Sequence, residues 1–263
     1  MPTFDSFDKQ NKTTTVEYDF TDKQSKGLFL SKVFGMMFIC LLITTVVAAG
    51  LGYGFQALLL NAYNSGNTQL TNDLVTGLIV VLIVSAIALL VMSFVLPITF
   101  ARGKHNIIVP LIIYVVLMGV LLSSFTMIFD WVILVEAFGI TALIFGVMGL
   151  LGYLTKGRMA GIGVILLGLI MGALILSLVN WLMILIGGVS QANVTISWIV
   201  SLLIFAFLMF VTMYDVYRIK TIAENGATQD NNLVNYCAFI LYSDFIAILI
   251  RVVYFLAIFT RKR

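Results

Sequence analysis

The stretch that decides the fold is residues 107–129, IIVPLIIYVVLMGVLLSSFTMIF, in which 23 consecutive positions carry no charged side chain. A helix needs about 20 apolar residues to cross a hydrocarbon layer of ~30 Å. Polar residues that are typical of turns, Asn106 and Asp130, border the stretch on either side. The segment is therefore expected to be a transmembrane helix.

Comparable apolar stretches recur along the whole chain. Of its 263 residues 61% are hydrophobic and 10% are charged, whereas a soluble domain has roughly 45–50% and about 25%. Seven spans are expected, at Leu28–Leu51, Leu74–Phe100, Ile107–Phe129, Trp131–Leu154, Met159–Ile186, Val194–Tyr217 and Leu233–Phe259. The predicted fold class is an all-α integral membrane protein, with a polar tail at 1–27, a transmembrane domain at 28–259 and a basic tail at 260–263.

Lys and Arg in the short loops predict the orientation, because positive residues are retained on the cytoplasmic side. The N-terminal tail is positive, the 52–73 connection has no Lys or Arg, and Arg102 and Lys104 restore the positive charge. The alternation continues to Arg218, so we expect the N-terminus in the cytoplasm. Full crossing of the last span would place the basic tail outside, and a re-entrant hairpin is the alternative. The length of 233–259 and its lack of Pro and Gly favour crossing.

Net charge and cysteine content exclude some functions. The net charge is +3 and the basic residues are scattered, so no nucleic-acid partner is expected. Cys40 and Cys237 lie in apolar runs and are expected to be buried thiols. The Gly168 and Gly172 pair is interpreted as packing within the chain, which predicts a monomer in the lipid bilayer.

Four ionisable residues lie inside the expected spans: Glu136, Asp215, Asp244 and Arg251. A charge at the bilayer centre costs at least ~2.5–3.5 kcal/mol on insertion scales, so each of the four is a candidate functional residue.

Asp215 is expected about 5 Å inside the cytoplasmic edge of the membrane, and Asp244 ~16 Å deep from the same side, at ~1.5 Å rise per residue. If their carboxylates meet at ~4 Å with an effective dielectric of ~20, repulsion between the ionised forms is about 4 kcal/mol. Such a pair shares one proton and titrates as a unit. When the proton leaves, two anions repel each other or attract a hard cation. The alternative is that each Asp separately faces backbone or water without coupling.

Glu136 is predicted to point into the bundle, because it shares a helical stripe with small residues, which mark close helix contacts. The stripe consists of Gly139, Ala142, Gly146 and Gly149. Arg251 lies in the same outer half of the membrane, so an intramembrane Glu136–Arg251 ion pair is predicted.

Three motifs resemble the transmembrane Bax inhibitor motif family, in particular its bacterial members. The first is VEAFGITALIFGVMG at 135–149, the second is Tyr214-Asp215 followed by Arg218-Ile219-Lys220, and the third is ILYSDFI at 240–246. Together with the number and order of spans, the resemblance covers the whole chain.

The resemblance implies six helices around a central seventh and a pH-sensitive calcium leak. In this reading Asp215 and Asp244 hold a closed pore through a shared proton and are the residues that meet the calcium ion. The family's latch arginine at the inner end of the second span is matched here by Arg102. Two departures are Ala247, where the family often has Asn, and the added positive charge of Arg251.

Other functions fit the residues less well. A non-conducting regulator of a membrane protease or of a stress or cell-death factor, with a membrane-protein partner, is the alternative. An intramembrane aspartyl protease is a remote alternative, because Leu241-Tyr242-Ser243 stands where a Gly-x-Gly motif should precede the second Asp. We expect no enzymatic activity and no permanently bound cofactor, with Ca²⁺ and protons as the transported or regulatory ions. The expected location is a bacterial plasma membrane.

Overall fold

The computed structural model describes residues 23–66, 68–102, 106–155, 191–224 and 231–260, together with the isolated positions 172, 178 and 182. Its helices are α1 (Lys23–Asn64), α2 (Thr68–Arg102), α3 (Ile108–Ile128), α4 (Trp131–Leu154), α6 (Gln191–Glu224) and α7 (Asn231–Thr260). These six helices of the described ranges are each long and apolar enough to cross a membrane.

The predicted all-helical fold with long apolar helices is confirmed, whereas the predicted count of seven spans is not tested. The expected fifth span, Met159–Ile186, falls outside the described residues except at three isolated positions. Most of the N-terminal tail, residues 1–22, and residues 261–263 also lie outside the described part of the chain.

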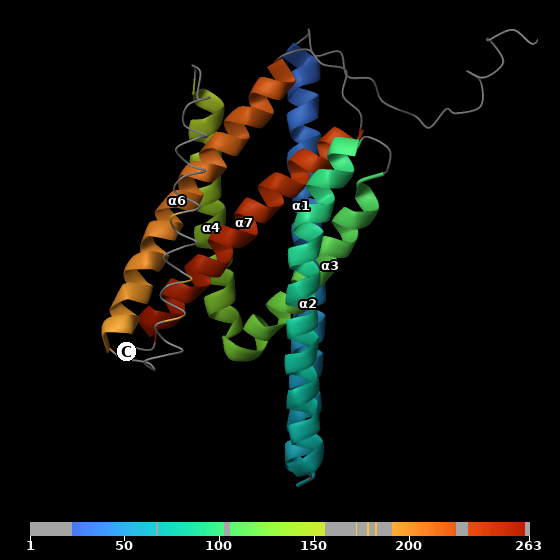
Figure 1. Cartoon of the computed structure of the whole chain (residues 1–263), viewed down its shortest axis with the longest axis vertical. Helices are drawn as coiled ribbons and strands as arrows, with labels where there is room; N and C mark the ends of the chain where they lie inside the picture. Colours follow the sequence, from blue (N-terminus) through green and yellow to red (C-terminus); the bar gives the residue numbers. More distant parts are fainter. Residues whose placement is uncertain are drawn as a thin grey trace, which may run out of the picture.

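The first two helices are longer than the sequence predicted. The expected loop at 52–73 is helical except around Ser65 and Gly66, and Figure 1 shows α1 and α2 projecting together beyond the other helices. α1 has 42 residues, or ~63 Å at ~1.5 Å per residue, about twice the thickness of the hydrocarbon layer. The helix ends where Gly66 takes a φ of 68°, a left-handed conformation that favours glycine. Isolated Asn and Gly residues before that point do not stop the helix.

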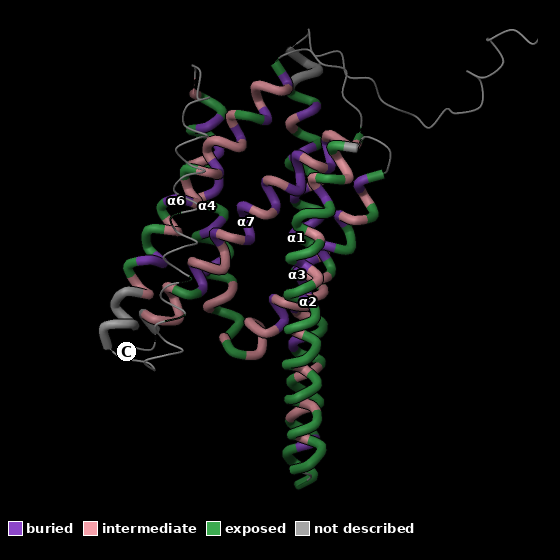
Figure 2. The backbone as a smooth tube through the Cα atoms, viewed as in Figure 1, coloured by how far each residue is buried: buried purple, intermediate pink, exposed green. Residues whose placement is uncertain are grey.

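α7 is the helix that the other described helices share. It packs against α1, α2, α3, α4 and α6 and crosses the bundle obliquely (Figure 1). Its side chains at Leu241, Tyr242 and Ile248 are fully buried, and purple segments recur along it in Figure 2. Asn231–Thr260 is one continuous helix, which contradicts the re-entrant hairpin, and full crossing of the membrane by this helix stays a prediction.

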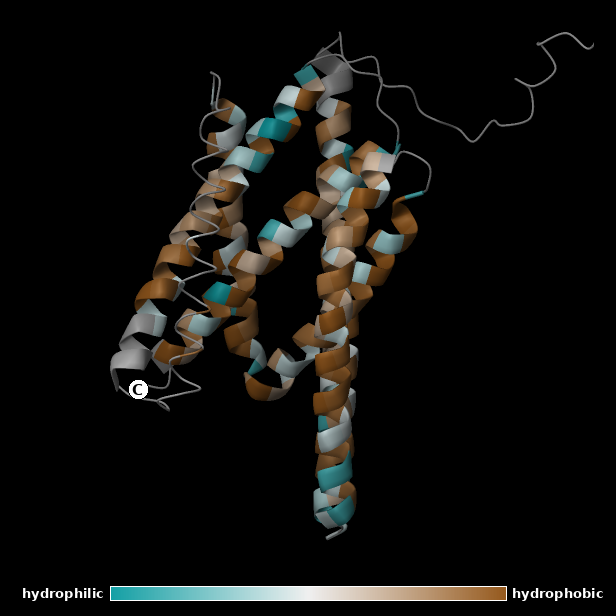
Figure 3. Cartoon of the chain, in the orientation of Figure 1, coloured by the Kyte–Doolittle hydropathy of each residue, from teal (hydrophilic) through white to brown (hydrophobic). Residues whose placement is uncertain are grey.

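The outer surface of the bundle is apolar. Large side chains such as Val46 and Leu143 are 70% and 71% exposed, and hydrophobic colouring covers most of the helix surfaces in Figure 3. An apolar exposed surface of this extent is incompatible with water and fits contact with lipid chains. Cys40 and Cys237 are free and buried, as predicted.

Candidate functional site

The structure brings Asp215 of α6 and Asp244 of α7 together. α6 and α7 pack against each other, and the two carboxyl groups lie within hydrogen-bonding range of each other. An ionised carboxylate has no hydrogen to donate, so a hydrogen bond between two carboxyl groups requires a proton on one of them. Close approach of the two side chains was predicted, and their role as gate or ion site stays a prediction.

Asp244 is the more deeply buried member of the pair. It is 8% exposed, and its neighbours Leu241, Phe245 and Ile248 are apolar and buried. Its Oδ2 atom has no hydrogen-bond donor in the described structure. An ionised group in such surroundings is costly unless it is compensated, and a second carboxylate would add repulsion, so the contact with Asp215 is favourable only when one of the two groups carries a proton.

Arg218 supplies positive charge beside the pair. It lies three residues after Asp215 on α6, is exposed, and interacts electrostatically with Asp215, Tyr236 and Cys237. The sequence analysis treated Arg218 only as a marker of the cytoplasmic side. Its spacing of three residues from Asp215, about one helical turn, was the available signal.

The predicted latch, Arg102, ends α2, but its side chain lies outside the described residues. The end of α2 does reach α7 near the pair, because the ring of Phe100 stacks on Tyr236 with 4.2 Å between centroids and 5° between planes. Tyr236 is itself within electrostatic range of Asp215. The backbone position of Arg102 is therefore compatible with the latch hypothesis, which stays a prediction.

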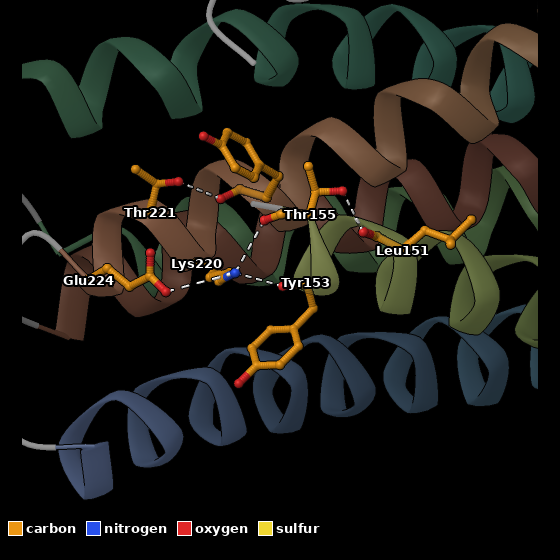
Figure 4. A network of polar contacts seen from close by, with 7 residues as sticks. Leu151, Tyr153, Thr155, Lys220, Thr221 and Glu224 are labelled. Carbon is orange, nitrogen blue, oxygen red and sulfur yellow. Dashed lines mark hydrogen bonds and ion pairs between the residues drawn. The ribbon is translucent and has the colours of Figure 1, made fainter. Parts of the chain in front are cut away.

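Lys220 fastens α6 to the end of α4 (Figure 4). Its Nζ donates to the carbonyl oxygens of Tyr153 at 2.7 Å and Thr155 at 3.3 Å. The ammonium group also lies 5.2 Å from the centroid of the Tyr153 ring and 3.8 Å from Glu224 Oε1. The last carbonyls of a helix lack partners within the helix, and a cation at this end also interacts favourably with the negative end of the helix dipole. The sequence analysis missed this contact.

Tyr242 fastens α7 to α1 and α3. Its hydroxyl lies 2.6 Å from Thr44 Oγ1, and Thr44 Oγ1 also donates to the carbonyl of Val115 at 3.3 Å. Tyr242 and Thr44 are both buried. Tyr242 is two residues from Asp244, so this contact fixes the position of Asp244 along α7 relative to α1. It too was missed.

The predicted Glu136–Arg251 ion pair does not form among the described residues. The Arg251 guanidinium instead donates a hydrogen bond to Ser201 Oγ at 3.4 Å. The ion pair seen among the described residues is Lys220–Glu224. Glu136 is exposed, contrary to the prediction that it points inward.

The orientation of α4 explains this difference. The buried residues of α4 are Ala137, Thr141, Phe145, Gly149 and Gly152, a set spaced by three and four residues. The predicted stripe of small residues is offset from this set: Gly139, Ala142 and Gly146 are exposed. Of the predicted stripe, Gly149 is the member that faces the other helices, so the face that α4 buries differs from the predicted one.

Metal ligands are sparse in the described structure. Among its residues, no group of three or more His, Cys, Asp and Glu side chains is placed to hold a metal ion. Ca²⁺ prefers six to eight oxygen ligands, of which the two aspartates supply a minority.

The fold and the intramembrane acidic pair define an integral membrane protein with an ionisable site inside its helix bundle. A family model described as "Inhibitor of apoptosis-promoting Bax1" matches residues 27–261. The chain is also 30% identical over 224 residues to inner membrane protein YbhL of Escherichia coli strain K12, covering 83% of this chain and 86% of the relative. The same values hold for YbhL of Escherichia coli O6:H1 strain CFT073. The chain thus belongs to the Bax inhibitor-1-like family, as the resemblance predicted.

Proposed function

We propose that this protein is a pH-sensitive calcium leak whose closed state is held by a proton shared between Asp215 and Asp244. The observation that carries the proposal is the direct contact of the two carboxyl groups across the α6–α7 interface. The resemblance to pH-sensitive members of the family supports the same role. We place the protein in a bacterial plasma membrane with a cytoplasmic N-terminus, supported by the loop charges and by the inner-membrane relative.

The proposed gate opens when the shared proton leaves. While the proton is present, one carboxyl group donates to the other and holds α6 against α7. When both groups are ionised, they repel by about 4 kcal/mol at ~4 Å and an effective dielectric of ~20. That energy is large compared with the ~0.6 kcal/mol average of an interhelical hydrogen bond in a membrane. Separated carboxylates also attract a divalent cation, which gives the opened path its proposed selectivity.

Contacts near each aspartate hold α6 and α7 to different neighbouring helices. Lys220 holds α6 to α4, five residues beyond Asp215. Tyr242 holds α7 to α1, two residues before Asp244. Because each acid is on a helix that is fastened to a different neighbour, repulsion between them acts on the α6–α7 interface. Arg218 beside Asp215 lessens the repulsion and sets how far the pH must rise.

The test is calcium flux into liposomes that contain the purified protein and a calcium indicator, measured from pH 6 to pH 8. We expect flux to rise with pH, since loss of the proton opens the gate. Asp215→Asn and Asp244→Asn should each abolish or flatten this pH dependence, because an amide does not titrate. Asp130→Asn is the matched control, since Asp130 is exposed and its side chain makes no capping hydrogen bond at the start of α4.

Other outcomes decide against the proposal. Absence of flux in all proteins, with an added ionophore showing that the vesicles are intact, would favour the non-conducting regulator. An unchanged pH profile in both Asp→Asn variants would remove the acidic pair from the gate. Peptide cleavage that either variant abolishes would revive the aspartyl protease.

A further inference from the structure

A cavity of about 500 Å³, whose lining does not include Asp215 or Asp244, lies among four of the described helices. Its walls come from α1, α3, α4 and α7. Representative lining residues are Leu42 and Ala49 of α1, Phe125 of α3, Phe138 of α4, and Ile246 and Leu249 of α7. None of its lining residues is charged.

The three threonine hydroxyl groups in the cavity wall are already satisfied within the protein. Thr44 Oγ1 bonds with Tyr242 and Val115. Thr45 Oγ1 donates to the carbonyl of Leu41 at 2.8 Å. Thr126 Oγ1 donates to the carbonyl of its own helix at Ser123, also at 2.8 Å. Water in a buried cavity needs two to four polar partners, and this wall offers few, so the cavity favours an apolar occupant.

Among the described helices, none closes the cavity between α1 and α4. α1 packs on α3 and α7, and α4 packs on α6 and α7, whereas α1 and α4 make no extensive contact with each other. At this opening Leu42 of α1 and Val135 of α4 are 50% and 61% exposed. The helices on both sides are candidate membrane spans, so hydrocarbon chains are the material next to the opening.

We propose that an acyl chain of a bilayer phospholipid enters between α1 and α4 and lies against Ile246 and Leu249 of α7. An apolar cavity of ~150 Å³ stays dry and binds benzene, and this cavity of about 500 Å³ is roughly three times larger. The chain fills space that water does not stabilise. The site goes beyond the proposed leak and holds whether or not the protein conducts calcium.

The test is photolabelling in liposomes of phosphatidylethanolamine and phosphatidylglycerol that contain a phosphatidylcholine with a diazirine in one acyl chain. After irradiation, labelled positions are mapped by mass spectrometry. We expect label on Leu249 or Ile246 but not on Ile248, which is on the same helix and is fully buried outside the cavity lining. Label on Leu249 and Ile246 no greater than on Ile248 would overturn the proposal.

Two variants test whether the label arises from the cavity. Ala49→Phe fills it, because Ala49 lines the wall, and should lower labelling of Leu249 by roughly threefold or more as the ring takes up the packing space. Ala57→Phe is the matched control on α1, since Ala57 is exposed and outside the lining. Unchanged labelling of Leu249 in Ala49→Phe would contradict the site.

A second measurement keeps the proposal falsifiable if Ala49→Phe does not fold. Ala49→Cys is made in a chain in which Cys40 and Cys237 are alanine, and the vesicles are treated with a charged thiol reagent. We expect no reaction, because a charged reagent does not enter a hydrocarbon-filled cavity. Rapid modification would identify a watery vestibule and overturn the proposal.

Discussion

Gly152 allows α4 to approach α6 beside the acidic pair, and replacing it by alanine tests that packing. A Cβ atom added at Gly152 would collide with the carbonyl oxygen of Met213 and lie 3.1 Å from its carbonyl carbon. Met213 is two residues before Asp215. Because the obstacle is helix backbone, it has no rotamer by which to move aside. Gly152→Ala must therefore push the two helices apart.

The expected cost of Gly152→Ala is about 1–3 kcal/mol, the usual range for a core side chain that is too large. For a chain of this size, that lowers the midpoint of thermal unfolding by roughly 2–4 °C per kcal/mol. Helix propensity has the opposite sign, since Ala is favoured over Gly by about 1 kcal/mol. Gly146→Ala isolates propensity, because nothing lies within 4 Å of a Cβ atom at Gly146. That variant should be as stable as the parent or slightly more stable.

The assay uses the chain's own cysteines. Cys40 and Cys237 are free and only 2% and 1% exposed, so a thiol-reactive fluorescent dye reports their exposure as the protein unfolds in detergent. A lower midpoint for Gly152→Ala alone is expected. Equal midpoints for Gly152→Ala and the parent would refute the close α4–α6 contact, and destabilisation by Gly146→Ala would show that the exposed face of α4 is packed.

Three further predictions use the same assay. Tyr242→Phe and Thr44→Ala should show a coupling energy of about 0.5–1.5 kcal/mol in a double-mutant cycle, the net worth of one hydrogen bond; simple additivity would mean that the bond does not form. Lys220→Met should cost about 1.5–3 kcal/mol because it removes charged donors from two carbonyls, whereas Glu224→Gln should cost less than ~1 kcal/mol as an exposed ion pair; equal costs would assign the role of Lys220 to the ion pair. Glu136→Gln should leave the midpoint unchanged, because Glu136 is exposed; a marked decrease would indicate a buried partner.

The sequence predicted which segments form long apolar helices better than how long those helices are. The span at Ile107–Phe129 is almost the same as α3 (Ile108–Ile128), because charged and polar residues border it closely. The first helix runs on through Gly54 and Gln56 to Asn64, since single polar or small residues cost a helix little compared with a turn. The length of a helix could therefore be predicted only where several polar residues mark both of its ends.

The contact of the two aspartates was predicted for a physical reason. A carboxyl group in the membrane needs a partner or water, and only a few residues at the right depth can provide one. The same argument also predicted the Glu136–Arg251 pair, which does not form among the described residues, and it was the family resemblance that favoured Asp215 and Asp244. By contrast, the Tyr242–Thr44 contact joins residues 198 positions apart, and ordinary Tyr and Thr residues carry no comparable penalty that would pair them in advance.

The face that α4 buries shows why apolar patterns have limited value inside a bilayer. In water, an apolar side chain turns toward the core because exposure is unfavourable, and helical periodicity then indicates the buried face. In lipid both faces are apolar, and only close packing and polar contacts select between them. Gly149 and Gly152 are buried toward α6, whereas Gly139 and Gly146 are exposed, although all four are the same residue type on one helix. A small residue thus permits a close helix contact without specifying one.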